Sequence, residues 1–327
     1  MRVSRISDIK WNNSLSISAS EGYLSSTSKN YGWLCDHDEG MFIPFAIFNR
    51  RHLFSELVFT DDICYIIKDE KCPSERKKEF LAACVEYVKR KLKVDNIIQQ
   101  PAFAAFEIAP TGATAVPFGS YRIDLTQSHD NLWKNVHSKH KNVIRKAEKS
   151  GVIVKSGIEY LNAAVDLVSA TLRRSNIKPL DLNYITRLSG KLQGHILPYV
   201  CEYKGEYQGS AIYLFSGKSA LYLWGGSLQE PFTGSINYMH WNAILDFKNR
   251  NVRCYDFVGA RIKPAEGSKL EGIQRFKSRF GGPMYQGYLW KYPLSWKCLH
   301  YNNLKKIYFK MKGINSKDII DQELQCQ

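Results

Sequence analysis

The sequence predicts an α+β protein of two domains, with mixed sheets flanked by helices, and three observations support this. The chain has 327 residues, and one domain usually takes roughly 100–200. It is 44% hydrophobic and 13% aromatic, which is enough for two substantial cores. Residues 197–227 contain three apolar runs separated by turn sequences, and helical and strand patterns alternate after them. Antiparallel strands followed by such alternation are typical of α+β domains.

Paired strands and a helix are predicted in the first part of the chain. The strand patterns cover residues 40–50 and 53–61, and shorter strands are expected at 94–100 and 121–125. The helix is expected to begin with Ser74 as its N-cap. Its apolar positions are Phe80, Leu81, Cys84, Val85 and Val88.

The second part of the chain is clearer, and its predicted order is β-β-β-α-β-α-β. The three strands of the meander are separated by turns at Lys204–Glu206 and Ser216–Lys218. A helix follows with Ser235 as its expected N-cap. Its apolar face contains Ile236, Met239, Ala243, Ile244 and Phe247. The remaining expected elements are a strand at 252–260, a helix at 270–280 and a strand at 284–290.

Charge and cysteine usage limit the partners and the compartment. The net charge is +15 and the pI is about 9.3, which favours an anionic partner such as nucleic acid, nucleotide phosphates or a membrane surface. Eight cysteines are scattered without a C-x-x-C pair, which predicts reduced thiols and no metal site. The chain has no apolar run of about 18 residues and no apolar segment near its start that would resemble a secretory signal. We therefore expect a cytoplasmic protein.

One lysine lies among the apolar residues of the last predicted helix. Leu270, Ile273, Phe276 and Phe280 follow helical spacing and predict a buried stripe. Lys277 falls within the same arc. Two interpretations are open: it extends from the edge of the stripe to water, or it borders a cleft and meets negative charge.

The strand before this helix carries an acidic residue between two aromatic ones. Asp256 lies between Tyr255 and Phe257, so alternation places its side chain on the opposite face. It is either a general base for an incoming amine or the structural partner of an arginine or lysine. Arg261 and Lys263 follow in a loop and either bind phosphates or face solvent.

A basic helix is predicted over residues 133–151. Its cations are Lys134, Lys139, Lys141, Arg145, Lys146 and Lys149. Its expected buried side is Trp133, Val136, His140, Val143 and Ala147. The cations either bind a polyanion or form a solvated face. His137 and His140 have no acidic or cysteine neighbour that would complete a metal site, so we interpret them as surface or half-buried histidines.

Two further segments have open interpretations. Cys35–Glu39 reads "CDHDE", which we expect to be a solvated loop and not a metal cluster. Residues 296–313 interleave aromatic residues with lysines. That pattern suits an anionic membrane or RNA, and ordinary packing against the first domain is the preferred interpretation.

Three segments together resemble a known family. They are Tyr121–Val152, Ala220–Ile244 and Tyr255–Gly282. They are similar to the GNAT acyltransferase fold and, more narrowly, to the Fem family of aminoacyltransferases that build peptidoglycan cross-bridges. The most specific pattern is Y-D-F-x-G followed by F-K-x-x-F-G-G.

The resemblance implies two tandem GNAT-like domains without the coiled-coil insertion of some family members. The first would cover residues 1–126 joined by 291–327, and the second 127–290. Lys277 would stabilise the charge that develops during acyl transfer, with Asp256 as the second catalytic residue. Implied substrate-binding residues are Phe276, Tyr255, Arg261 and Lys263. Implied polyanion-binding residues are Lys139, Lys141, Arg145 and Lys146.

The resemblance also bears on the donor and acceptor. No tightly bound cofactor is implied; the donor would be aminoacyl-tRNA or acyl-CoA. GNAT enzymes that use acyl-CoA usually have a Q/R-x-x-G-x-G/A loop whose amides bind pyrophosphate. Here Gln229 and Gly234 are present with different spacing, which weakens acetyl-CoA as donor.

The implied acceptor is an amine of an anionic small-molecule or lipid-linked envelope precursor. The positive charge also fits tRNA and transient contact with the inner membrane surface, and no DNA partner is expected. An acyl-CoA-type N-acyltransferase acting on an amino sugar in surface-polysaccharide synthesis is one alternative. A non-catalytic GNAT-like scaffold that binds RNA or a partner is another.

Overall fold

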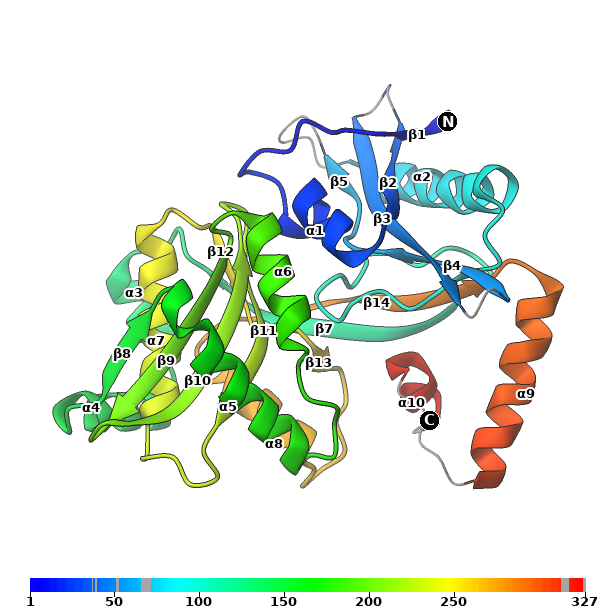
Figure 1. The fold of residues 1–327 in the computed structure, drawn as a ribbon. Coiled ribbons are helices and arrows are strands. Elements are labelled where there is room, and N and C mark those ends of the chain that lie inside the picture. The colour runs from blue at the N-terminus through cyan, green and yellow to red at the C-terminus, as the bar shows by residue number, and fades with distance from the viewer. Residues whose placement is uncertain (37, 39, 51–52, 66–71, 313–317, 326–327) are drawn as a thin grey trace. The chain divides into compact units, whose positions relative to one another are not determined.

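The computed structural model describes the chain except residues 37, 39, 51–52, 66–71, 313–317 and 326–327, so Cys35–Glu39 lies partly outside the described residues (Figure 1). The chain divides into two compact units. Unit 1 comprises Met1–Trp11, Ser18–Gly119 and Gln286–Gln327, and unit 2 comprises Asn12–Ile17 and Ser120–Tyr285. Unit 1 therefore includes the C-terminal segment. That this unit is itself a GNAT-like domain stays a prediction.

Unit 1 contains a mixed sheet with the strand order β1-β2-β3-β4-β6-β14. Neighbouring strands are antiparallel except β4 and β6, which are parallel. Its strands are β1 Val3–Ile6, β2 Asn30–Asp36, β3 Met41–Arg50, β4 Phe54–Phe59, β5 Cys64–Tyr65, β6 Asn96–Ile97 and β14 Met284–Pro293. Its helices are α1 Glu21–Thr27, α2 Ser74–Tyr87, α9 Trp296–Lys312 and α10 Ile319–Gln325.

The predicted elements of unit 1 are present, with one shift. β3 and β4 are the expected strand pair, and Phe45 lies opposite Phe59. Helix α2 begins at Ser74, but its N-cap is Pro73, so the predicted serine cap is wrong by one position. The backbone of Pro73 is extended, and Ser74 is therefore already helical. The core includes Phe59, Phe106 and Trp290, whose ring centroids lie 5.4 to 6.0 Å apart.

Unit 2 is built on a sheet with the order β7-β12-β11-β10-β9-β8. The predicted meander is confirmed, because β9, β10 and β11 are antiparallel neighbours, while β11 and β12 are parallel. The strands are β7 Thr114–Asp124, which enters from unit 1, β8 Ile153–Ser156, β9 Ile196–Tyr203, β10 Glu206–Phe215, β11 Ala220–Ser227, β12 Cys254–Asp256 and β13 Ala260–Arg261. The helices are α3 His129–Asn135, α4 Ser138–Lys149, α5 Leu161–Arg174, α6 Leu182–Leu192, α7 Ser235–Asn249 and α8 Lys269–Ser278.

The helices of unit 2 differ from prediction in two places. The basic segment forms two helices, α3 and α4, because Val136 is extended and His137 caps α4 by accepting a hydrogen bond from the Lys139 backbone. The N-cap of α7 is Gly234, with φ of 91°, and Ser235 is the first helical residue. The structure also adds β8, α5 and α6, which the sequence analysis does not place.

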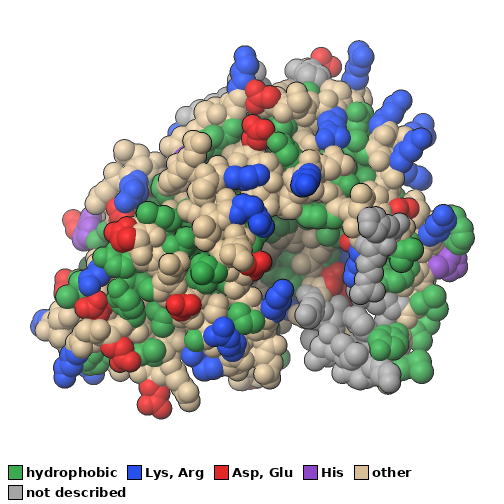
Figure 2. Space-filling view, viewed as in Figure 1, with side chains coloured by type: hydrophobic (Ala, Val, Ile, Leu, Met, Phe, Trp, Pro, Cys, Tyr) green, Lys and Arg blue, Asp and Glu red, His purple; other side chains and the backbone are tan. Residues whose placement is uncertain are grey.

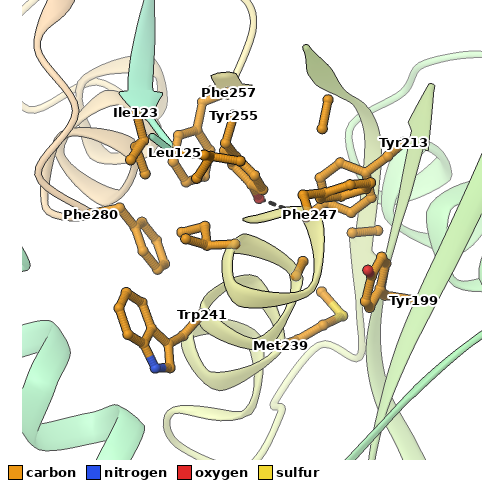
Figure 3. Close-up of a cluster of buried hydrophobic side chains, with 14 of the residues drawn as sticks. Ile123, Leu125, Tyr199, Tyr213, Met239, Trp241, Phe247, Tyr255, Phe257 and Phe280 are labelled. Atoms are coloured by element: carbon orange, nitrogen blue, oxygen red, sulfur yellow. Dashed lines mark hydrogen bonds between the residues drawn. The ribbon is translucent and has the colours of Figure 1, made fainter. Parts of the chain in front are cut away.

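Helices lie on both faces of the unit 2 sheet (Figure 1). Helix α5 packs on β10 and β11, and α7 packs on β9 and β10. The core on the α7 side is rich in aromatic rings, including Tyr199, Tyr213 and Phe247 (Figure 3). This core supports the end of β12, where the candidate site begins.

No helix among the described residues combines the length and the apolar character needed to cross a bilayer. Within the same part of the chain, no three His, Cys, Asp or Glu side chains lie together as a metal site would require.

Candidate active site

Helix α8 buries a different face from the one that its apolar residues predict. Leu270 and Ile273, expected in the buried stripe, are 46% and 41% exposed. The buried residues of the helix are Gln274 and Lys277. Lys277 is only 9% exposed. The first half of the predicted stripe is therefore wrong, and so is the interpretation that Lys277 extends to water.

Both buried polar side chains of α8 donate to backbone carbonyls of the segment from β12 to β13. Nζ of Lys277 donates to the oxygens of Val258 and Gly259, the latter at 2.8 Å. Nε2 of Gln274 donates to the oxygen of Arg261. These acceptors explain why polar residues, and not Leu270, face the sheet. An ammonium has three N–H donors, so one donor of Lys277 is left for a further acceptor.

The turn after β12 has an unusual backbone. Val258 and Gly259 are both left-handed, with φ of 39° and 59°. This conformation is rare for a β-branched residue and costs roughly 1–2 kcal/mol. The turn is held on both sides: the N–H of Val258 donates to Oδ1 of Asp256 at 2.8 Å, and its carbonyl accepts from Lys277. In this turn the carbonyl groups of Val258 and Gly259 therefore both point toward the ammonium of Lys277.

Asp256 is buried and every contact it makes is structural. Its Oδ2 accepts from Nε of Arg122 at 2.7 Å, and its Oδ1 accepts from Ser120 Oγ and the Val258 N–H. The guanidinium of Arg122 lies over the ring of Tyr285 at 3.9 Å. A general base needs a lone pair that faces the incoming amine. The geometry therefore favours the structural partnership with an arginine that the sequence analysis left open.

Tyr213, His240 and Tyr255 form a buried, hydrogen-bonded cluster, and Tyr255 directly precedes Asp256 in β12. The hydroxyls of Tyr213 and Tyr255 are 2.7 Å apart, and Nδ1 of His240 lies 2.9 and 2.7 Å from them. In Figure 3 the Tyr255 hydroxyl points toward Tyr213. Burial lowers the pKa of His240 to about 3, and the charges of Lys277 and His140 add to the shift. His240 is therefore neutral near pH 7, and its Nδ1 is hydrogen-bonded to these tyrosine hydroxyls.

Tyr255 and Phe276, two predicted substrate-binding residues, lie in packed surroundings. Tyr255 is fully buried, which argues against direct contact with a substrate. Phe276 is half-buried, and its ring centroid lies 5.3 Å from that of His140 and 5.5 Å from that of His240.

His140 joins α4 to α8, because its Nε2–H donates to the Phe276 carbonyl at 3.0 Å. Burial lowers the pKa of His140 to about 4. The side chain is 5% exposed, which confirms its predicted place on the buried side of the helix and shows that the interpretation as a surface or half-buried histidine is wrong.

The predicted phosphate- and polyanion-binding residues are nearer the surface. Arg261 is half-buried and Lys263 is exposed. On α4, Lys141 is half-buried, and the other three predicted cations are exposed: Lys139, Arg145 and Lys146. Lys141 and Arg145 lie 5.8 and 5.4 Å from the ring centroid of Trp133. Their positions are compatible with anion binding, which stays a prediction.

A cavity of about 380 Å³ opens beside the site in unit 2. Its wall includes Arg122, Asp124, Asn135, Arg253, Phe280 and Gly281. Arg122 connects this wall to Asp256, whereas Lys277 is not part of the lining. The cavity therefore contacts the partner of Asp256 and not the ammonium itself.

The two glycines after α8 allow its end to pack closely. Gly281 has φ of 91°, as the predicted left-handed helix end requires. A Cβ atom at Gly281 would lie 2.6 Å from the Asn135 carbonyl oxygen, and one at Gly282 would lie 2.5 Å from that of Arg122. Because the glycines have no side chain, the backbone of α3 and β7 can contact them directly. This contact fixes the end of α8, the helix that carries Lys277.

Five residues of this network are not among the predicted site residues: Ser120, Arg122, Tyr213, His240 and Gln274. His240 had a detectable signal, because it is a polar residue beside the apolar face of α7, as Lys277 is in α8. Ser120 and Arg122 had none, because they lie 136 and 134 residues from Asp256 in the chain.

Comparison with known proteins supports this fold. Residues 134–278 match a family model described as an acetyltransferase (GNAT) domain. The crystal structure of FemX matches with a TM-score of 0.64 and 13% identity, over 89% of this chain and 97% of that one. The C-terminal domain of a putative lysylphosphatidylglycerol synthetase from Agrobacterium fabrum matches with a TM-score of 0.52 and 13% identity, over 80% and 84% of the two chains. L-PGS from Bacillus licheniformis matches with a TM-score of 0.50 and 12% identity, over 83% and 87%. No curated protein matches the sequence.

Residues 134–278 therefore form a GNAT-type acetyltransferase domain, and the class of protein that this domain defines is an acyltransferase. Over most of the chain the fold is similar to that of FemX. The expected resemblance to Fem-like proteins is confirmed at the level of the fold.

The glycine at the end of α8 gives a direct test of the packing. Gly281→Ala is expected to lower the free energy of unfolding by about 2–3 kcal/mol, because it combines a positive φ with a backbone clash. Gly272→Ala is the matched control, because no atom lies within 4 Å of the added Cβ, and it should stabilise the helix by up to about 1 kcal/mol. Urea denaturation measures both. Equal effects would contradict the close approach to Asn135.

The role of Asp256 is tested by Asp256→Asn. The change leaves Arg122 without its carboxylate partner and should lower the free energy of unfolding by about 2 kcal/mol. Asp166→Asn, at an exposed position of α5, is the control and should change it by less than about 0.5 kcal/mol. An Asp256→Asn protein of unchanged stability that has lost acyl transfer would restore the general-base interpretation.

Proposed function

We propose that this chain is a cytoplasmic Fem-like N-acyltransferase, which moves an aminoacyl or acyl group onto an amine of an anionic cell-envelope precursor. The observation that carries the proposal is the buried ammonium of Lys277. Two carbonyls of the turn after β12 hold it, and one N–H remains for a substrate oxygen.

The reaction that suits this ammonium is attack of an amine on an ester or thioester. The nitrogen forms a bond to the carbonyl carbon, the carbonyl oxygen becomes an oxyanion, and the C–O or C–S bond then breaks. The proton lost by the nitrogen balances the alkoxide or thiolate that leaves. A cation that is already desolvated and fixed in place stabilises the oxyanion more strongly than a solvated one. Lys277 has both properties, because it is buried and held by two acceptors.

Charge supports an anionic substrate. The chain carries a net charge of +15, and the exposed Arg145 of α4 lies 5.4 Å from the ring centroid of Trp133. The name of one structural neighbour, a putative lysylphosphatidylglycerol synthetase, contains both an aminoacyl group and an anionic lipid. By analogy, this supports an aminoacyl group and an anionic acceptor here.

The loop before α7 bears on the donor. A Cβ atom at Gly234 would lie 2.1 Å from the Val143 carbonyl oxygen. The backbone of α4 therefore approaches the glycine that an acyl-CoA loop would present to pyrophosphate. This supports aminoacyl-tRNA, or a CoA ester bound in another way, as donor. An acyl-CoA-type enzyme acting on an amino sugar of a surface polysaccharide is the second proposal, favoured by the acetyltransferase family match.

Replacement of the ammonium tests the chemistry. Lys277→Met keeps the length of the side chain but removes its charge, and should reduce acyl transfer by at least about 100-fold. Lys178→Met, at an exposed lysine of unit 2, should keep the wild-type rate. Transfer from charged tRNA and from acyl-CoA is measured with a panel of amine acceptors. Transfer from CoA alone would favour the second proposal. If neither donor is consumed, a non-catalytic scaffold is the better description.

The same lysine predicts a pH dependence. Burial lowers the pKa of Lys277 from 10.5 to about 8, and Asp256 opposes the shift. Between these values the unfolded chain binds one more proton, so this group makes the folded state more stable as pH rises from about 8 to 10.5. The folded protein loses the ammonium as the pH rises through its pKa of about 8. The ratio of the wild-type rate to that of Lys277→Met should therefore fall above about pH 8. A ratio that stays constant from about pH 6 to 10 would contradict an electrostatic role.

A further inference from the structure

Helix α9 presents a row of apolar side chains to solvent. Each of the five is more than half exposed: Trp296, Leu304, Ile307, Tyr308 and Met311. At about 100° per residue they fall within an arc of about 120°. We call them the α9 stripe. The predicted packing of this segment against the first domain is wrong for the stripe. The lower right of Figure 2, where α9 lies in Figure 1, shows hydrophobic side chains at the surface.

The opposite side of α9 attaches the helix to unit 1. Cys298 is buried, and its sulfur accepts a hydrogen bond from Nδ2 of Asn302 at 3.6 Å. Nearer the stripe, the ring of Tyr301 contacts that of Phe54, with centroids 5.1 Å apart. Cys298 lies about 140° from the centre of the stripe. The helix is therefore anchored through one side and leaves the stripe uncovered by unit 1.

The charged residues of α9 are all basic. Its sequence contains five lysines and no acidic residue. Lys297 is exposed and, by helical register, falls within the arc of the stripe. A helix that combines exposed apolar residues with lysines and lacks carboxylates is typical of helices that lie in the interface of a bilayer. Trp and Tyr rings favour the same depth.

We propose that α9 binds the surface of an anionic lipid bilayer, with the α9 stripe in the boundary between headgroups and acyl chains and the lysines at the lipid phosphates. Lipid is a better ligand than RNA for this stripe, because three of its side chains are not aromatic and offer no ring on which a base can stack: Leu304, Ile307 and Met311. Five lysines without a carboxylate select anionic over neutral lipid, since each is worth roughly 1 kcal/mol near such a surface. The helix is too short to span the bilayer and lies parallel to it. The proposal does not depend on the acyl-transfer reaction.

Vesicle co-sedimentation of the full chain tests this binding. The probes are vesicles of phosphatidylcholine with about one third phosphatidylglycerol, and vesicles of phosphatidylcholine alone. Ile307→Asp should weaken binding to the anionic vesicles about tenfold, since it removes one buried aliphatic side chain. Ile177→Asp is the control, because Ile307 and Ile177 are both 56% exposed, and it should bind as the wild type does.

A second pair of variants tests the charge. Lys306→Gln with Lys310→Gln should weaken binding roughly 30-fold, and Lys89→Gln with Lys91→Gln, at exposed lysines of unit 1, should not. Thermal unfolding monitored by circular dichroism checks that each variant is folded. The proposal is overturned if wild-type protein does not sediment with anionic vesicles, if Ile307→Asp binds as well as Ile177→Asp, or if the Lys89 and Lys91 pair loses binding instead. Binding of α9 to RNA without binding to vesicles overturns it as well.

Discussion

The carboxylate of Asp256 and the ammonium of Lys277 hold one strained turn between them, and the candidate site depends on that turn. Strand β12 ends at Asp256, between β11 and β7, so its position is set by hydrogen bonds on both edges. The carboxylate then holds the N–H of Val258, and the ammonium holds the carbonyls of Val258 and Gly259. A left-handed valine is unfavourable by itself. It persists here because charged partners on both sides satisfy its backbone groups.

Burial lowers the pKa of Lys277 only to about 8, so its ammonium is present near pH 7, and few other groups close to it carry a charge. Burial lowers the pKa values of His140 and His240 to about 4 and 3, so both imidazoles are neutral near pH 7. The positive charge of Arg122 is balanced by Asp256. The ammonium therefore lies among neutral rings and backbone dipoles, where the effective dielectric is low and an oxyanion would be strongly attracted. The glycines after α8 contribute indirectly, because they let the helix end approach α3 and β7 closely enough to fix this geometry.

Much of the architecture was predictable, because hydrophobic period and turn residues are local signals. The meander, α7, α8 and β14 lie where the patterns place them. The predictions that were wrong also have physical explanations. Helix α8 was expected to bury Leu270 and Ile273, because apolar residues usually face the sheet, but backbone acceptors of the β12–β13 segment take Gln274 and Lys277 instead. The basic segment was expected to be one helix, but Val136 is extended and divides it.

The sequence by itself determined the order of the elements, the net charge and the presence of one lysine within an apolar stripe. Each depends on composition or on residues within a few turns of one another. The tertiary structure decided which face of α8 is buried, that Asp256 pairs with Arg122 and Ser120, and that Tyr255 belongs to the core. It also decided that the apolar side of α9 is left uncovered. These outcomes depend on hydrogen-bond and packing partners in other elements of the fold, and no local pattern specifies them. Those of Asp256 lie 134 and 136 residues away in the chain.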